Sequence, residues 1–134
     1  MKSKLIRSGL LFVLVLLLTG CIVGPQSKVE DAVILTPVLL SPENGSATNG
    51  NAPKFEWYAI SGVTEYTFEI KLVSDDSVVA KERYQAEKRC DATVCSIPAP
   101  VELAPGDYKW HVVGWVEDVR GEYSKYFTLT INEE

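Results

Sequence analysis

The sequence has very few of the side chains from which catalytic and metal sites are usually built. Its 134 residues include one histidine, His111, three cysteines and no glycine-rich phosphate-binding loop. Nucleophilic catalysis needs a base beside the nucleophile, and a tetrahedral metal site needs several converging ligands. Asp75 and Asp76 are the obvious pair for glycoside hydrolysis. They lie in residues 74–77, however, which predict a tight turn where Asp is favoured by bonds to the backbone. We therefore expect no enzyme, no cofactor and no metal site.

The sequence also lacks an apolar run long enough to cross a membrane. The longest run, residues 10–18, has nine apolar residues. As a helix it would span about 13 Å, whereas the hydrocarbon core of a bilayer measures roughly 30 Å. The run follows Lys2, Lys4 and Arg7 and ends at small residues. This order predicts that residues 1–20 are a cleaved secretory signal peptide and not a transmembrane helix.

The signal peptide ends in a specific motif, Leu18-Thr19-Gly20-Cys21. All four positions resemble the lipobox of bacterial lipoproteins. The resemblance implies that Cys21 becomes the first residue of the mature protein and carries a diacylglycerol on its thiol. Each buried methylene contributes about 0.8 kcal/mol, so two or three acyl chains anchor a protein durably in the membrane. Ile22 stands where Asp would favour the inner membrane, which implies the outer membrane if the cell has two.

Basic side chains are scarce in the rest of the chain. Three of the 13 Lys and Arg residues precede Cys21, so 10 basic and 18 acidic side chains remain. The mature chain would have a net charge of 10 − 18 = −8, which is more negative than the −5 of the whole chain. Such a surface repels phosphate backbones. We expect no nucleic-acid partner.

Residues 21–36 show no alternating pattern and contain the chain breakers Gly24 and Pro25. They predict a tether behind the lipidated cysteine. A flexible chain of about 15 residues has a typical reach of roughly 20 Å, which keeps the domain close to the bilayer. The run Val33-Ile34-Leu35 is open to a second interpretation, an early edge strand that would shorten the tether.

Residues 37–134 predict one all-β domain. Short apolar-alternating runs are separated by turn residues, which is typical of an antiparallel sandwich. The expected strands are residues 38–40, a strand that begins at 55–57, then 66–72, 78–84, 93–97, 106–117 and 127–131. Residues 43–53 predict a loop, and no segment predicts a helix. Seven strands in this length match an immunoglobulin-like sandwich.

Several residues occur in the order in which one family of domains carries them. These are Leu40-Ser41-Pro42 with Gly45, then Phe55, Trp57 and Tyr66, then Leu103 with Gly106-Asp107-Tyr108, and Gly121 with Tyr123-Ser124. Together they resemble the fibronectin type III and related immunoglobulin-like modules of bacterial surface proteins. The resemblance implies a corner before the sixth strand, where the Tyr108 hydroxyl bonds back to nearby backbone. The segment between Cys90 and Cys95 departs from the family's pattern.

Cys90 and Cys95 are the two cysteines that remain when Cys21 is acylated. A pair of cysteines in an exported protein predicts a disulfide. Redox chemistry is the alternative, but the spacing is C-x₄-C and not C-x-x-C. A metal site would need ligands beyond the two thiols and His111.

The aromatic residues give the one indication of a binding surface. Strand alternation places Trp57 and Trp110 in the core, and Trp115 on the opposite side with His111 and Val113. If the last strand pairs with 106–117, Tyr126 and Thr128 join that side. His111 is then expected to be half-exposed, and Trp115 is either open to a partner or covered by the tether.

These expectations lead to two functional hypotheses. The first is a non-catalytic, lipid-anchored module of the cell envelope that binds another envelope protein through this face. The second is a lipoprotein that binds carbohydrate or peptidoglycan, with Trp115 and Tyr126 as a stacking platform.

Overall fold

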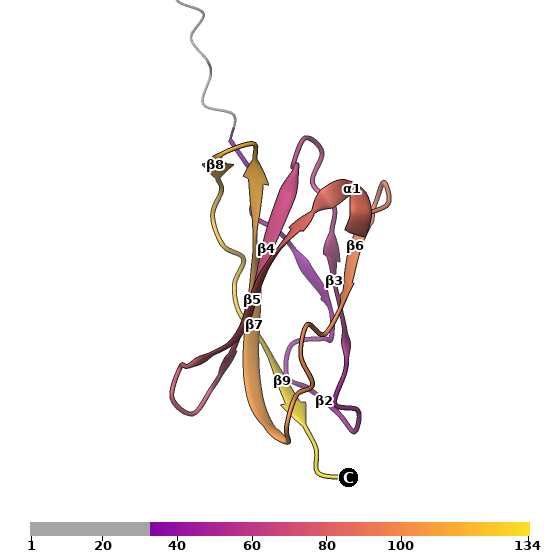
Figure 1. Cartoon of the computed structure of the whole chain (residues 1–134), viewed down its shortest axis with the longest axis vertical. Coiled ribbons are helices and arrows are strands. Elements are labelled where there is room, and N and C mark those ends of the chain that lie inside the picture. Colours follow the sequence, from indigo (N-terminus) through magenta and orange to yellow (C-terminus); the bar gives the residue numbers. More distant parts are fainter. Residues whose placement is uncertain (1–32) are drawn as a thin grey trace, which may run out of the picture. The chain divides into compact units, whose positions relative to one another are not determined.

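The computed structural model describes residues 33–134, and most of these residues lie in β-strands (Figure 1). The prediction of an all-β chain is confirmed for this part. The predicted signal peptide, Cys21 and most of the predicted tether lie outside the described residues. Within residues 33–134, no helix has the length and apolar character needed to cross a bilayer.

The smaller of two sheets has three strands. β3 (Lys54–Tyr58) lies between β1 (Leu39–Ser41) and β6 (Val94–Pro98), and both pairings are antiparallel. Phe55 and Trp57 of β3 are fully buried, whereas Lys54 and Tyr58 are exposed. The sheet therefore buries one face and leaves the other in solvent.

The larger sheet is built around β7 (Gly106–Val116), the longest strand. β4 (Glu65–Leu72) pairs with one side of β7, and β5 (Val78–Gln85) forms the edge beyond β4. β9 (Phe127–Ile131) pairs with the other side of β7, and β2 (Ser46–Thr48) runs parallel to β9. β8 (Val119–Arg120) folds back on the end of β7 as a hairpin.

The described residues thus contain nine strands, not seven, and one short helix, α1 (Ala86–Arg89). β2 lies in the segment expected to be only loop. It forms because the outer edge of β9 has backbone groups that need partners. Gly45 N donates to Thr128 O at 2.9 Å, and Asn132 N donates to Thr48 O at 2.9 Å. The parallel β2–β9 pairing also makes the sheet mixed and not purely antiparallel.

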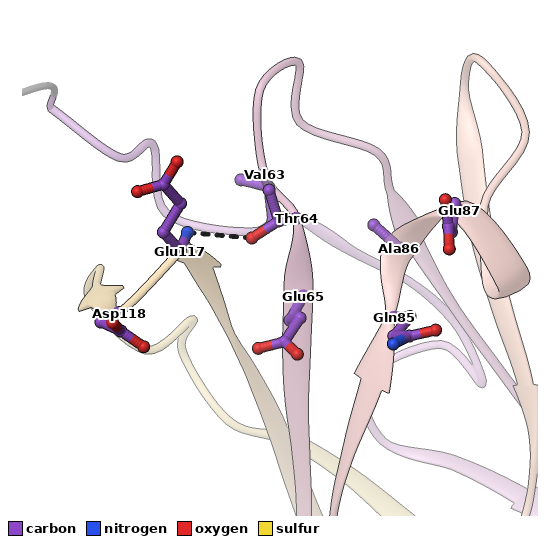
Figure 2. A pocket seen from close by; sticks show the side chains of 8 residues that line it. All are labelled: Val63, Thr64, Glu65, Gln85, Ala86, Glu87, Glu117 and Asp118. Carbon is purple, nitrogen blue, oxygen red and sulfur yellow. Dashed lines mark hydrogen bonds between the residues drawn. The ribbon is translucent and has the colours of Figure 1, made fainter.

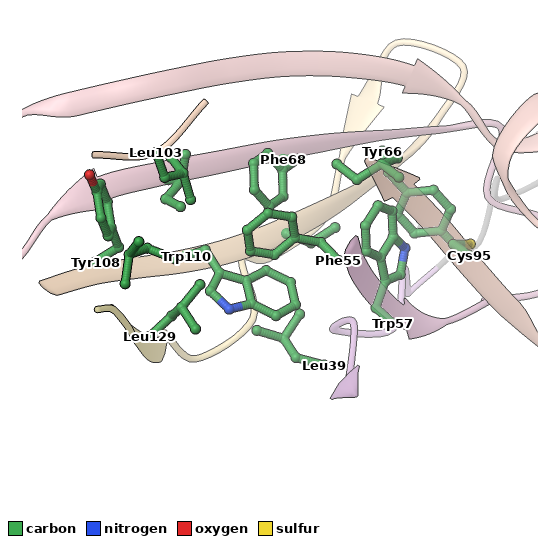
Figure 3. Close-up of a cluster of buried hydrophobic side chains, with 14 of the residues drawn as sticks. Leu39, Phe55, Trp57, Tyr66, Phe68, Cys95, Leu103, Tyr108, Trp110 and Leu129 are labelled. Carbon is green, nitrogen blue, oxygen red and sulfur yellow. The ribbon is translucent and has the colours of Figure 1, made fainter. Parts of the chain in front are cut away.

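The two sheets enclose a core rich in aromatic rings (Figure 3). Phe55 of the smaller sheet lies 4.7 Å from Phe68 and 5.0 Å from Trp110 of the larger sheet, measured between ring centroids. Trp57 packs edge-on against Tyr66 at 5.4 Å. The expectation that Trp57 and Trp110 point inward is confirmed, since both are fully buried. Edge-to-face contacts of this kind stabilise beyond their burial alone.

The predicted disulfide is present between Cys90 and Cys95. It closes a tight turn in which the Asp91 carboxylate accepts hydrogen bonds from Thr93 N at 2.7 Å and Val94 N at 2.8 Å. Cys95 is fully buried opposite Trp57 in the smaller sheet. The crosslink therefore ties α1 to the core, and its short loop contributes roughly 2 kcal/mol in a chain-entropy account.

Residues 33–38 precede the first strand and are not a strand themselves. The edge-strand interpretation of Val33-Ile34-Leu35 is therefore wrong. Ile34 nevertheless packs against the larger sheet. A Cβ on Gly114 of β7 would lie 3.6 Å from the Ile34 Cγ2 atom, and a Cβ on Gly121 would lie only 2.7 Å from it. Pro37 is buried as well. The chain thus contacts the domain before residue 36, where the tether was expected to end.

The corner before β7 has the hydrogen bond that the sequence predicts. The Tyr108 hydroxyl donates to the Ala104 carbonyl at 2.6 Å, and Tyr108 is almost completely buried. Its ring is among those drawn in Figure 3. The bond fixes the loop that leads the chain from the smaller sheet into β7.

Tyr108→Phe should lower the free energy of unfolding by about 1 kcal/mol, because the ring stays buried while the Ala104 carbonyl loses its donor. Urea unfolding of the chain should show a lower midpoint at an unchanged slope. Tyr58→Phe is the matched control, since Tyr58 is 46% exposed. Equal midpoints for the two variants would show that the corner bond contributes nothing to stability.

Candidate functional site

The candidate site is the side of the larger sheet that faces away from the core. The register places Glu65, Thr67, Glu69 and Lys71 of β4 opposite Trp115, Val113, His111 and Lys109 of β7, pair by pair. We call this surface the outer face. It comprises Glu65, Thr67, Glu69, Lys71, Lys81, Arg83, Lys109, His111, Val113, Trp115, Arg120, Tyr123, Tyr126 and Thr128.

The structure brings all five residues of the expected binding face to this surface, but their exposure differs from the expectation. His111 is only 7% exposed and Val113 is fully buried, although Val113 does not belong to the core cluster. Trp115 and Tyr126 are half-buried, and Thr128 is exposed. The expectation of a half-exposed His111 is therefore wrong, because other side chains cover the centre of the outer face.

The cover comes mainly from the chain between β8 and β9. Ser124 N donates to Val112 O at 2.8 Å, and Ser124 Oγ accepts from Val112 N at 3.1 Å. These bonds hold the segment along the edge of β7. Its irregular backbone turns both Tyr123 and Tyr126 onto the outer face. The His111 ring is stacked between them, with ring centroids 4.0 Å away on each side.

Sequence reasoning missed Tyr123. Strand alternation links residues two apart, whereas Tyr123 and Tyr126 are three apart, so a period of two places only one of them on this side. The sequence between them contains no turn signal that predicts the change in direction. The repeated Tyr was the only available hint.

Glu69 is the charged group at the centre of the outer face. His111 Nε2 lies 2.8 Å from Glu69 Oε1, and Lys81 Nζ lies 3.3 Å from Oε2. Burial opposes ionisation of Glu69, but the hydrogen bonds from His111 and Lys81 outweigh it and lower the pKa of the carboxyl group. Burial also lowers the pKa of His111, against the opposing effect of Glu69. Near neutral pH, a neutral imidazole therefore donates to an ionised Glu69.

Trp115 is held at one end of the outer face. Its indole N–H donates to Thr67 Oγ1 at 2.9 Å. The guanidinium of Arg83 lies 3.9 Å from the ring centroid and forms an ion pair with Glu65. One ring face of Trp115 is thus already occupied by a cation–π contact.

The other end of the outer face surrounds Tyr126. Lys109 Nζ lies 4.9 Å from the Tyr126 ring centroid and Lys71 Nζ lies 6.0 Å from it. Both lysines also form ion pairs with Asp76. The hydrogen bond and charge of Lys109 lower the pKa of the Asp76 carboxyl group. The rings of this end are therefore bordered by cations.

The outer face gathers positive charge in a domain that is acidic as a whole. Residues 33–134 contain nine Lys and Arg side chains and 16 Asp and Glu side chains. Five of the nine cations belong to the outer face, namely Lys71, Lys81, Arg83, Lys109 and Arg120. This unequal distribution is the clearest chemical feature of the described surface.

An open hollow at one end of the sandwich has the opposite charge (Figure 2). Glu65, Glu87, Glu117 and Asp118 line it, and Thr64 Oγ1 accepts from Glu117 N at 3.0 Å. Across residues 33–134, no three or more His, Cys, Asp or Glu side chains converge as metal ligands would. Glu65 is already paired with Arg83.

Comparison with known proteins does not assign this chain to a family. No protein-family model and no curated protein sequence matches this chain. The chemistry of the outer face and the motifs of the sequence are therefore the basis for a function.

Acidification should destabilise the domain in a window that begins near pH 6.5. His111 has its ordinary pKa near 6.5 when unfolded and a lower pKa when folded. Between these values the unfolded chain binds more protons, so stability falls as the pH falls. Glu69 adds a second loss below about pH 4.5, because its folded pKa is also lowered. Urea midpoints measured from pH 8 to pH 3.5 test this.

His111→Gln is the informative variant, since it keeps an N–H donor and removes the titration. His111 is the only histidine of the chain. The variant should therefore lose the slope between pH 6.5 and pH 5 and keep the loss below pH 4.5. A parent protein with a constant midpoint from pH 8 to pH 5 would contradict the role of the buried imidazole.

Proposed function

We propose that this chain is a bacterial lipoprotein with an immunoglobulin-like domain, related to fibronectin type III modules, that binds another protein of the cell envelope without catalysing a reaction. The concentration of cations on the outer face of an acidic domain carries the binding part of the proposal. The lipobox and the strand order support the remaining parts.

The strand order supports the immunoglobulin-like assignment. In such sandwiches the first, second and fifth main strands share one sheet, and the third, sixth and seventh share the other. When β2 and β8 are set aside as short additions, β1, β3 and β6 occupy the first set. β4, β7 and β9 occupy the second. The bond from the Tyr108 hydroxyl to Ala104 O matches the tyrosine corner of this fold.

The anchor is supported by the order of the N-terminal signals. A basic start, a nine-residue apolar run and the complete motif Leu18-Thr19-Gly20-Cys21 occur in the order that lipoprotein export requires. Acyl chains on Cys21 would hold the domain at the membrane surface. Ile22 favours the outer membrane in a cell that has two.

Cys21→Ser should prevent lipidation and release the protein from the membrane fraction. Cells fed with a clickable palmitate analogue should label the parent chain and not this variant. A variant that combines Cys90→Ser with Cys95→Ser is the matched control, because it removes the other two thiols and should keep the label. Labelling that persists in Cys21→Ser would disprove the anchor.

The geometry favours a protein partner over a sugar. Sugar rings stack on open aromatic faces, but His111 covers one face of both Tyr123 and Tyr126. Arg83 covers a face of Trp115. The cations around these rings offer charge-assisted hydrogen bonds to carboxylates, and complementary charge speeds and directs association between proteins. The expected partner is an envelope protein with an acidic binding segment.

Removing two of the five cations of the outer face should weaken partner capture by about tenfold, which corresponds to a loss of roughly 1.4 kcal/mol of binding free energy. The test is crosslinking and affinity capture of the full lipoprotein, tagged at its C-terminus, from native membranes. The test variant combines Lys109→Gln with Arg120→Gln. The control combines Lys54→Gln with Lys88→Gln, which removes the same charge from the smaller sheet and α1.

One or two envelope proteins identified by mass spectrometry, retained by the control and lost by the test variant, would support the proposal. Equal capture by both variants would remove the outer face as the binding surface. Recovery of glycan or peptidoglycan fragments without a protein would favour the carbohydrate hypothesis instead.

A further inference from the structure

β5 forms an edge of the larger sheet that is not paired with any other strand in residues 33–134 (Figure 1). It is eight residues long, and its far side carries the backbone groups that a neighbouring strand would bind. Edges of this length are templates for an added strand unless charge or shape protects them. The side chains of β5 indicate which strand the edge would accept.

The register shows which backbone groups are free. Ala86 N donates to Thr64 O at 2.9 Å, next to the Glu65–Gln85 pair. In an antiparallel ladder, pairs that exchange hydrogen bonds alternate with pairs that do not. Tyr84 and Glu82 therefore bond to β4. Lys81, Arg83 and Gln85 direct their N–H and C=O groups away from the sheet.

The same alternation places the side chains of Lys81 and Arg83 on the outer face. They lie opposite Glu69 and Thr67 of β4, respectively. A residue added opposite Lys81 or Arg83 would place its own side chain on the outer face, with the two Cβ atoms about 5 Å apart. Free backbone groups and positive side chains thus belong to the same residues of β5.

A second copy of this chain fits the middle of the β5 edge poorly. Two β5 strands related by a two-fold axis would pair antiparallel with a residue at the centre. Centred on Glu82, the pairing sets Lys81 opposite Arg83 and Glu82 opposite Glu82. Centred on Lys81, it sets two lysines face to face. Like charges directly opposite one another are destabilising, so pairings centred on Glu82 or Lys81 are disfavoured.

We propose that β5 accepts an extended segment of the envelope partner as an added strand, with carboxylates at alternate positions opposite Lys81 and Arg83. This rests on the proposed function and identifies the part of the partner that is bound. The backbone of the segment bonds to Lys81, Arg83 and Gln85, and its carboxylates complete the charge balance of the outer face. Its intervening residues lie beside Glu82 and are uncharged or basic.

The test uses the full lipidated chain in zwitterionic detergent micelles and three fluorescent peptides of eight residues. The first has Glu at every second position with Thr or Val between. The second has Lys in place of Glu. The third keeps every Glu but has N-methyl groups on alternate backbone amides along the bonding edge, which blocks strand addition without changing the charge.

The acidic peptide should bind at least about tenfold more tightly than either of the others, which corresponds to a difference of roughly 1.4 kcal/mol. A variant that combines Lys81→Glu with Arg83→Glu should reverse the preference and bind the Lys peptide. Amide hydrogen exchange should slow at Lys81, Arg83 and Gln85 on binding, and change little at Glu82 and Tyr84. A single cooperative thermal transition confirms that the variant is folded, although the loss of the Lys81–Glu69 and Arg83–Glu65 pairs lowers its midpoint.

Equal binding of the N-methylated and unmodified peptides would overturn strand addition, because the contact would then be ionic alone. Absence of binding by any peptide at millimolar concentration would overturn it as well. Membrane capture distinguishes this failure from failure of the proposed function. A partner that is captured through Lys109 and Arg120 while the peptides fail leaves the envelope-binding role intact without β5.

Discussion

The rest of the structure depends on the burial of β7 on both of its sides, although the second sheet covers only one. On the core side, Trp110 and Val112 pack against the smaller sheet. On the other side, His111 and Val113 are equally withdrawn from water. A sheet with one solvated face would normally place polar residues there. This sheet instead covers the second face with long side chains and with the segment that joins β8 to β9.

This cover determines what the outer face can recognise. Tyr123 and Tyr126 enclose the His111 ring, so one face of each tyrosine ring is engaged within the domain. The pairs of Arg83 with Glu65 and of Lys109 with Asp76 are near the surface, where each contributes about 1 kcal/mol or less. Because such pairs are weak, a partner's carboxylate can replace Asp76 or Glu65 beside a lysine or arginine at small cost. The aromatic rings stabilise the conformation of the outer face. In the proposed function, the cations around them bind the carboxylates of the partner.

The sequence predicted most of what depends on alternation and little of what depends on distant contacts. The period of two in β4 and β7 correctly placed Trp110 in the core and Trp115 on the opposite side. The corner at Tyr108 and the pairing of Cys90 with Cys95 were also correct. β2 was missed because its pairing arises from the free edge of β9, 83 residues away. The burial of His111 was missed for the same reason, since its cover comes from an irregular segment whose spacing of three matches neither strand nor helix.

Net charge and local charge act over different distances on this domain. The excess of carboxylates repels acidic molecules at long range, but salt screens exposed charges beyond about 8 Å at physiological ionic strength. Within that distance the outer face presents five cations, and the β5 edge presents free backbone groups beside two of them. In the proposed function, the excess of carboxylates disfavours a highly acidic protein at close range, whereas a partner with a few carboxylates on one extended segment meets the cations of the outer face. The proposed specificity combines a local attraction with a general repulsion, by which an acidic strand is selected and acidic surfaces are excluded.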